Sequence, residues 1–160
     1  MPVLRVVLLS FFLLLQVAAK SSCDVGWLDA SYVAMGCLLF NSSAPLTWLE
    51  ANARCQDYGQ ARLVEVYDDL QLDFLAMELN LLDDQGQDGH HWWTAGNDIG
   101  CEGNWTWMGS HVPVKDFMWG SNHPTEDTAS NCLGLFYGLD YRGVDIPCRA
   151  TSYPICQKFP

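Results

Sequence analysis

The chain of 160 residues is poor in positive charge, with 8 Lys and Arg against 19 Asp and Glu and a formal net charge of -11. A protein of that charge repels phosphate groups, so the composition argues against nucleic-acid binding and against binding to anionic membrane surfaces. The sequence also lacks internal repeats, low-complexity tracts and linkers rich in Pro, Gly or Ser. We therefore expect one folded domain rather than an array.

Motifs of common enzyme classes are absent as well. The chain contains no Gly-x-Ser-x-Gly elbow and no metalloprotease histidine spacing. Asp68-Asp69 and Glu126-Asp127 are adjacent carboxylates, whereas a general acid and base must face one substrate from opposed positions. Nothing near Cys101 indicates the base that a cysteine nucleophile needs. We therefore predict that the protein is not an enzyme.

Zinc ligands do not occur in a recognisable pattern either. Adjacent His90 and His91 diverge in an extended chain, and His111, His123 and Cys101 do not stand at the short regular intervals of a zinc site. We therefore predict no zinc centre.

Long apolar runs are absent after residue 19. Before it, Arg5 precedes an apolar stretch from Val6 to Leu15, and Val17-Ala18-Ala19 are small residues that signal peptidase accepts. The stretch is too short to span a bilayer comfortably. The pattern predicts a secretory leader over residues 1–19, a single domain over residues 20–160, and an extracellular protein with no stable membrane insertion.

The chain has seven cysteines. In an exported protein they are interpreted first as disulfides, and an odd number leaves one thiol without an internal partner. Two N-x-[ST] sequons, at Asn41 and Asn104, suit the same compartment and are predicted glycosylation sites.

Two helices are predicted in the first half of the chain. Thr47 and Glu50 have the spacing of a capping box, and the helix that they start should end at Gly59. Its buried face should carry Trp48, Ala51, Cys55 and Tyr58. A second amphipathic helix is predicted over residues 69–82, with an apolar stripe at Leu70, Phe74, Met77 and Leu81.

The second half of the chain predicts strands. After residue 86 it is rich in Gly, Trp and turn residues, with short alternating runs. Alternation puts Trp105 and Trp107 on one face and Asn104 with Thr106 on the other, so a glycan on Asn104 would point to solvent. Helices followed by strands predict an α+β fold.

An ordered series of features indicates a family. Cys23 and Cys37 flank Gly26-Trp27, and two helices follow, the first of which carries Cys55. The later features are, in order, Trp93-Thr94-Ala95-Gly96, Trp105-Thr106-Trp107, Trp119, His123-Pro124-Thr125, Cys132, Asp145-Ile146-Pro147-Cys148 and Tyr153-Pro154-Ile155-Cys156. This series resembles the long form of the C-type lectin-like domain over essentially all of residues 20–160. The resemblance implies two helices, small antiparallel sheets and long loops.

The resemblance also implies a disulfide pairing, which sequence alone cannot choose. The implied pairs are Cys23 with Cys37, Cys55 with Cys156, and Cys132 with Cys148. Cys101 is left over between two glycines, which suggests a turn. An exposed thiol there predicts a disulfide-linked homodimer, and a buried reduced thiol is the alternative.

In family members that bind sugars, a calcium ion is held by a Glu-Pro-Asn or Gln-Pro-Asp tripeptide, an acid before the next cysteine, and a Trp-Asn-Asp strand. The corresponding positions here read His123-Pro124-Thr125, Ser130 and Gly143-Val144-Asp145. Only Asp145 keeps a strong oxygen ligand, so we expect the usual calcium site to be absent. The alternative is a remodelled site that recruits Glu126, Asp127 or Asn131. The family also has a cis proline, which falls on Pro124.

Two functions follow from the resemblance. The first is recognition of carbohydrate on microbial or cell surfaces, as in innate immunity, with a degenerate calcium site. Its candidate ligand-binding residues are His123, Thr125, Asn131 and Asp145, and its candidate stacking residues are Trp119, Phe136, Tyr137 and Tyr141. The second is a calcium-independent protein-interaction module on the same scaffold, because one fold hosts many functions.

Overall fold

The computed structural model describes residues 22–83, 91–125 and 127–160. The predicted leader, His90 and Glu126 lie outside these ranges. The predicted α+β class is confirmed, because in the described ranges two α-helices accompany a mixed sheet. Within the described ranges, no helix combines the length and the apolar character needed to cross a bilayer.

Helix α2 (Trp48–Gln56) starts at the predicted capping box. The Glu50 carboxylate accepts hydrogen bonds from Thr47 N at 2.9 Å and from Thr47 Oγ1 at 2.6 Å. Both bonds favour the ionised acid, so they lower the pKa of Glu50. The helix buries Trp48 and Cys55 as expected, but it ends at Gln56. Tyr58 therefore lies beyond the helix and is 38% exposed, so its predicted burial is wrong.

Helix α3 (Asp69–Asp83) has the predicted span but buries a different face. Leu70, Met77 and Leu81 are exposed, whereas the buried apolar residues are Leu72, Phe74, Leu75 and Leu79. The sequence carries leucines at helical spacing on two sides of the helix, so periodicity alone could not choose between them. Contacts with other elements determine which side of α3 is buried. Tyr141 Oη donates to Leu79 O at 3.4 Å, and Arg142 pairs with the exposed Asp73 at 3.2 Å.

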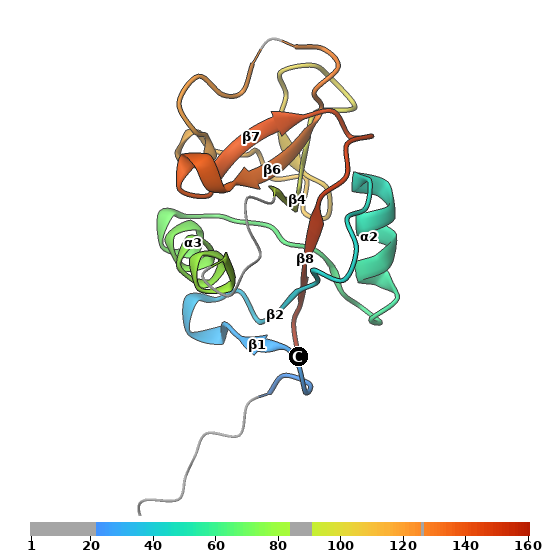
Figure 1. Cartoon of the computed structure of the whole chain (residues 1–160), viewed down its shortest axis with the longest axis vertical. Coiled ribbons are helices and arrows are strands. Elements are labelled where there is room, and N and C mark those ends of the chain that lie inside the picture. Colours follow the sequence, from blue (N-terminus) through green and yellow to red (C-terminus); the bar gives the residue numbers. More distant parts are fainter. Residues whose placement is uncertain (1–21, 84–90, 126) are drawn as a thin grey trace, which may run out of the picture.

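The sheet runs in the order β1-β2-β8-β4-β6-β7, with β3 paired to β8 and β5 paired to β4. Its strands are β1 (Leu28–Asp29), β2 (Cys37–Phe40), β3 (Arg62–Leu63), β4 (His91–Asn97), β5 (Thr106–Trp107), β6 (Cys132–Phe136), β7 (Arg142–Ile146) and β8 (Tyr153–Lys158). The described part of the chain also contains the short 3-10 helices η1 (Ser31–Val33), η2 (Asp116–Met118) and η3 (Tyr137–Leu139). Figure 1 shows β8 running through the middle of the molecule, with α2 and α3 on opposite sides of it.

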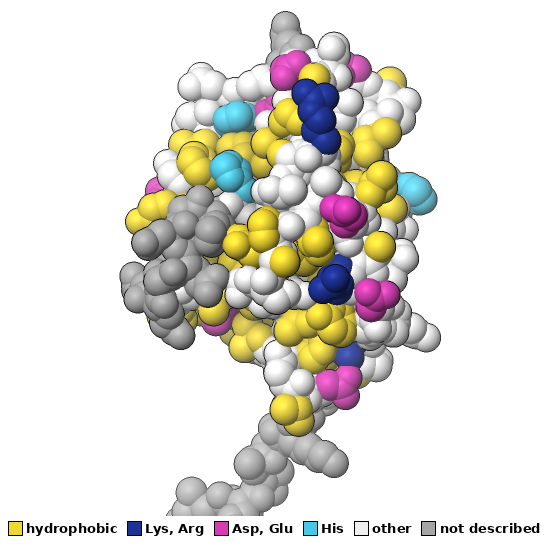
Figure 2. All heavy atoms as spheres, turned by 45° about the vertical axis from the view of Figure 1, so that its right-hand side comes forward, with side chains coloured by type: hydrophobic (Ala, Val, Ile, Leu, Met, Phe, Trp, Pro, Cys, Tyr) yellow, Lys and Arg dark blue, Asp and Glu magenta, His cyan; other side chains and the backbone are white. Residues whose placement is uncertain are grey.

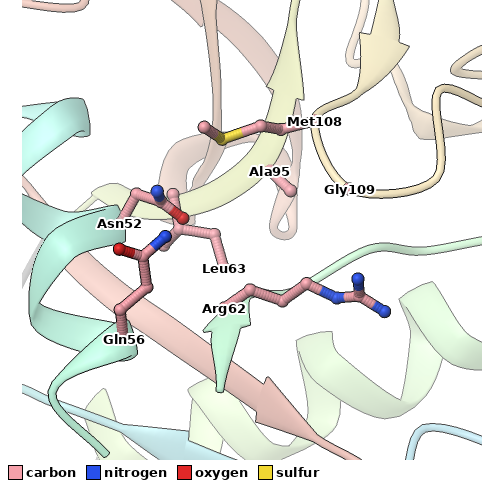
Figure 3. Close-up of a pocket in the computed structure, with 7 residues that line it drawn as sticks. All are labelled: Asn52, Gln56, Arg62, Leu63, Ala95, Met108 and Gly109. Atoms are coloured by element: carbon pink, nitrogen blue, oxygen red, sulfur yellow. The ribbon is translucent and has the colours of Figure 1, made fainter. Parts of the chain in front are cut away.

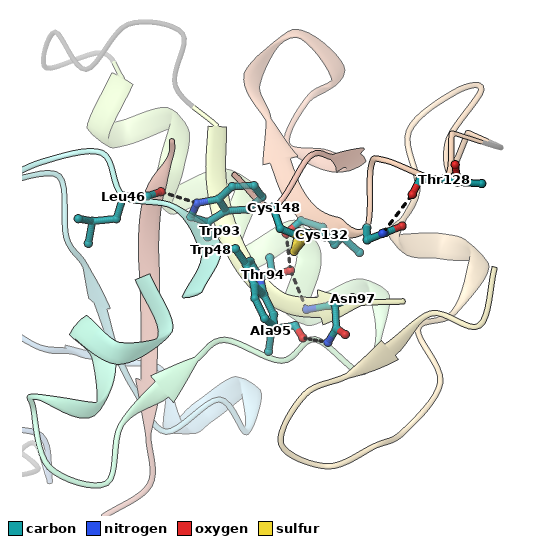
Figure 4. The surroundings of a disulfide bond; sticks show 12 residues. Leu46, Trp48, Trp93, Thr94, Ala95, Asn97, Thr128, Cys132 and Cys148 are labelled. Atoms are coloured by element: carbon teal, nitrogen blue, oxygen red, sulfur yellow. Dashed lines mark hydrogen bonds between the residues drawn. A yellow bond between two sulfur atoms is a disulfide. The ribbon is translucent and has the colours of Figure 1, made fainter. Parts of the chain in front are cut away.

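Strand β4 lies between β6 and β8, and its residues from Trp92 to Gly96 are buried without alternation. This is the pattern of a strand covered on both faces. The indole of Trp48 donates to Thr94 O, and the indole of Trp93 donates to Leu46 O, both at 2.8 Å (Figure 4). In the neighbouring segment, Trp105 and Trp107 are buried while Asn104 is exposed, which confirms the predicted alternation.

Three disulfides join Cys23 to Cys37, Cys55 to Cys156, and Cys132 to Cys148. They are the pairs that the family resemblance implies. Cys55–Cys156 ties α2 to β8, and Cys132–Cys148 holds the end of β7 to the start of β6 (Figure 4). Cys101 is a free, exposed thiol in the turn that follows β4.

Candidate functional site

The loop between η2 and β6 is fastened to β7 through one carboxylate. Asp145, on β7, has a side chain with 0% exposure. Its Oδ1 accepts from Thr125 N at 2.9 Å and lies 2.6 Å from His123 Nδ1, while its Oδ2 accepts from Thr125 Oγ1 at 2.5 Å. The peptide bond between His123 and Pro124 is cis, as the resemblance implies. Three of the four predicted ligand-binding residues therefore converge on one another.

The charge of Asp145 follows from these contacts. Burial raises its pKa, but hydrogen bonds from His123 and Thr125 stabilise the ionised form, and the pKa lies below its ordinary value. An ionised carboxylate only accepts hydrogen bonds, so His123 Nδ1 is the donor. In the neutral imidazole this leaves Nε2 as a hydrogen-bond acceptor.

The residues at the positions that hold calcium in the family are not arranged here to bind a calcium ion. A calcium ion takes roughly six to eight oxygen ligands. Both oxygens of Asp145 are already engaged by His123 and Thr125. The Asp127 carboxylate accepts from Ala129 N at 3.0 Å and from Ser130 Oγ at 2.9 Å. Among the described residues, no three His, Cys, Asp or Glu side chains gather as a metal site.

Asn131, the fourth predicted ligand-binding residue, lies beside Asp98, which was not predicted from the sequence. Asp98, at the end of β4, is 3% exposed, and its backbone N donates to Asn131 O at 3.2 Å. Asp98 Oδ2 accepts from Gly103 N at 2.8 Å, whereas Asp98 Oδ1 and Asn131 Oδ1 are buried with no hydrogen-bond partner among the described residues. The position of Asp98 directly after a buried strand is the signal that could have identified it.

The loops beside this site carry a negative charge. Partial desolvation raises the pKa of Glu102, and the charges of Asp98, Asp127 and Asp145 raise it further. On the face of the molecule in Figure 2, the few Lys and Arg side chains stand apart from one another and form no basic patch. The site therefore disfavours anionic ligands.

A cleft of about 420 Å³ lies beside His123. Its apolar side includes Trp105 and Trp119, whose rings meet edge to face at a centroid distance of 4.8 Å. Its polar side includes Asn104, Asp116 and His123. The cleft thus combines an indole surface with an imidazole, a carboxylate and an amide.

The other aromatic residues predicted to stack on a sugar lie elsewhere. Phe136 stacks on His91 at 4.5 Å, and Tyr141 is fully buried. Tyr137 is 50% exposed and packs edge to face with Tyr141. These residues stand at the end of the β6–β7 pair opposite to Asp145, because β6 begins near the loop and β7 ends there. Of the four predicted residues, only Trp119 lines the cleft.

The two sequon asparagines differ in exposure. Asn104 is exposed at the cleft. Asn41 is 9% exposed, its Nδ2 donates to Tyr58 Oη at 3.0 Å, and its Oδ1 accepts from Ser43 N. An N-linked glycan is attached to Nδ2, so a glycan on Asn41 would need space that the 9% exposure of this residue does not offer.

The fold, its three disulfides and the cis proline before the Asp145 network define a C-type lectin-like domain. The model of the Lectin C-type domain matches residues 44–158, and the chain belongs to this family. Human C-type mannose receptor 2 is 25% identical over 143 residues, which are 88% of this chain but only 9% of the receptor. The structure of human lithostathine superposes with a TM-score of 0.73 at 25% identity, covering 86% of this chain and all of that one. A calcium-independent type II antifreeze protein shares the fold, with a TM-score of 0.69 at 21% identity over 86% of this chain and 94% of that one.

Proposed function

We propose that this protein is an exported, non-enzymatic lectin that binds neutral carbohydrate on microbial or cell surfaces without calcium. The observation that carries the proposal is the Asp145 network, which engages the remaining calcium-type carboxylate and holds His123 at the edge of the cleft. Because Asp145 fixes the His123 imidazole, no metal ion is needed to position it. The ligand site is therefore the cleft rather than the usual calcium position.

The groups that line the cleft suit a hydroxylated ligand. The hydroxyls of a sugar can donate to His123 Nε2 and to the Asp116 carboxylate, and the Asn104 amide can both donate and accept. Trp119 offers an indole surface for the apolar face of a sugar ring. Since acidic groups surround the site, neutral sugars are favoured over sulfated or carboxylated ones.

Export is supported by the disulfides and by the predicted leader. Three disulfides persist in an oxidising compartment, not in the cytosol. One relative is named as a mannose receptor, which supports carbohydrate as the class of ligand.

A covalent dimer completes this proposal. The exposed thiol of Cys101 is available to a second copy of the chain, and two linked sites would raise avidity for a repetitive surface. Non-reducing electrophoresis of the secreted protein should show a dimer that reduction and the Cys101→Ser change both remove. A wild-type monomer would reject the dimer.

A calcium-independent protein-interaction module is the second candidate. The observation that favours it is the exposed apolar face of α3, formed by Leu70, Met77 and Leu81. Large apolar side chains exposed on one side of a helix are available to contact another protein.

A glycan array tests the first candidate against the second. The protein is applied with calcium and, separately, with a chelator, and equal binding in both conditions is expected. Asp116→Asn and His123→Ala should weaken binding, whereas Tyr137→Ala, an exposed aromatic outside the cleft, should not. Absence of binding in both conditions would exclude carbohydrate recognition. In that case, capture of an extracellular partner that is lost in Leu70→Ser and Met77→Ser would support the second candidate.

A further inference from the structure

A second cavity, of about 220 Å³, lies between α2, β3, β4 and the turn at Met108 and Gly109 (Figure 3). It shares no lining residue with the cleft beside His123. Its floor is apolar and consists of the buried Leu63 and Ala95, together with Met108, which is 37% exposed. A flexible methionine side chain adapts readily to a small apolar group.

The α2 side of this cavity is polar. Asn52 and Gln56 are four residues apart and therefore lie on one side of the helix. Figure 3 shows both amide groups pointing from α2 towards β3. Asn52 is only 8% exposed and lines the cavity, and no hydrogen bond to its side-chain amide occurs among the described residues. Its amide can therefore donate to and accept from a ligand in the cavity without breaking a bond within the protein.

The rim of the cavity is held in place by a buried carboxylate. Glu65 is 1% exposed, and its Oε1 accepts from Gly109 N at 2.8 Å and from Ser110 N at 3.1 Å. Its Oε2 accepts from Tyr67 Oη. A Cβ added to Gly109 would lie 2.5 Å from Glu65 Oε1 and 2.8 Å from Arg62 Nη1, so glycine allows this close approach. The turn that closes the cavity is thus fixed before any ligand arrives.

Opposite charges lie near each other at the rim. The Arg62 guanidinium and the Glu65 carboxylate both lie beside Gly109, which places a negative charge close to the cation that lines the cavity. A neutral ligand suits such a site better than a free anion. A primary amide donates and accepts at once, so its best partner is a group that does the same.

We propose that this cavity binds a secondary amide carrying a methyl group, that is, an acetamido group. The Asn52 amide donates to the ligand carbonyl and accepts from the ligand N–H. Gln56 lies beside Asn52, and its amide oxygen can also accept from the ligand N–H. The methyl group rests on Leu63, Ala95 and Met108. The acetamido group belongs either to an N-acetylated amino sugar or to an N-acetylated amino acid, and the experiment distinguishes these sources.

Titrations followed by NMR test the proposal on the folded, disulfide-bonded chain. N-acetylglucosamine and N-acetylalanine methylamide are the probes, and glucose, which has no acetamido group, is the control. At least one probe should shift the Met108 methyl and Asn52 side-chain resonances, and glucose should not. A response to only one of the two probes supports the site and assigns its source.

Asn52→Leu is the matched variant, because it replaces the amide by an apolar group of similar size. The affinity for the probe, followed at the Met108 methyl, should fall at least tenfold, whereas Tyr137→Ala, an exposed aromatic outside both this cavity and the cleft, should leave it unchanged. Since the Asn52 amide has no protein partner, the melting temperature of Asn52→Leu should equal or exceed that of the wild type. Absence of a response to both probes, an equal response to glucose, or undiminished binding by Asn52→Leu would each overturn the proposal.

Discussion

His123 Nδ1 lies 2.6 Å from Asp145 Oδ1, which joins the cis-proline loop to β7 across 22 positions of sequence. The imidazole and the two Thr125 donors engage both oxygens of this carboxylate. The loop is therefore held to β7 by hydrogen bonds within the protein.

The first prediction concerns the pKa of Asp145. Thr125→Val removes the donor to Oδ2 and should raise the pKa of Asp145, since the ionised form loses a hydrogen bond. Carboxyl chemical shifts followed against pH measure this. Thr128→Val, an exposed threonine in the same loop, is the control and should leave the pKa of Asp145 unchanged. An equal pKa in both variants would show that the Thr125 hydroxyl does not stabilise the carboxylate.

The same pKa predicts how stability depends on pH. The folded-state pKa of Asp145 lies below its ordinary value of 3.8, so this group stabilises the fold above that pH. Its contribution should be lost as the pH falls through the folded-state pKa. In Thr125→Val the folded-state pKa lies closer to the ordinary value, so the loss should be smaller and should be complete at a higher pH than in the wild type, which urea unfolding between pH 2 and pH 6 would measure. Parallel pH profiles for the variant and the wild type would contradict this.

A third prediction separates the two faces of α3. Leu79 is fully buried and Leu70 is 64% exposed, so the same substitution tests the observed face directly. Leu79→Ala should lower the free energy of unfolding by about 2–5 kcal/mol, and Leu70→Ala by less than about 0.5 kcal/mol. Urea unfolding of both variants provides the measurement. The reverse order would support the apolar stripe at Leu70, Phe74, Met77 and Leu81 that was predicted from the sequence.

A fourth prediction ranks two disulfides by the length of chain that they close. Cys55–Cys156 spans 101 positions and Cys23–Cys37 spans 14. In the loop-entropy model, replacing the first pair by alanine costs about 4.7 kcal/mol and replacing the second costs about 3 kcal/mol. Unfolding in urea without reductant compares the two double variants. A smaller loss for the Cys55–Cys156 pair would show that loop length does not govern these bridges.

A fifth prediction concerns the sequon at the cleft. Because Asn104 is exposed and lines the cleft, a glycan attached to it would compete with a ligand for the same space. Protein from a glycosylating host should bind its sugar more weakly than the Asn104→Gln variant. Thr106→Ala, which removes the sequon but keeps Asn104, should bind as tightly as Asn104→Gln if only the glycan matters. Unchanged binding after enzymatic removal of the glycan would contradict the prediction.

Local patterns predicted those features that neighbouring residues determine. The capping box at Thr47 and Glu50 and the alternation of Trp105 and Trp107 each depend on a few adjacent positions. The prediction of the buried face of α3 was wrong because both sides of the helix carry leucine, and contacts with the rest of the fold determine which side is buried. The disulfide pairs required the family resemblance, since spacing alone permits several pairings.

The candidate site was predictable only in part, for the same reason. His123, Thr125 and Asp145 were named from the family pattern, and the structure brings them together. The position of Asn131 beside Asp98 instead depends on β4 lying next to β6, which the sequence does not reveal. Phe136 and Tyr141 lie close in sequence to the site, but the strands carry them to the other end of the sheet.

The central place of β8 has a consequence for biosynthesis. This strand pairs with β2, β3 and β4, yet it is synthesised after all of them. The sheet therefore stays incomplete until residues 153–158 have been made, whereas Cys23 and Cys37 can pair long before that point. The Cys55–Cys156 disulfide can form only after the 101 positions that separate its cysteines have been synthesised, so the bridge that ties α2 to β8 is among the last native contacts to become possible.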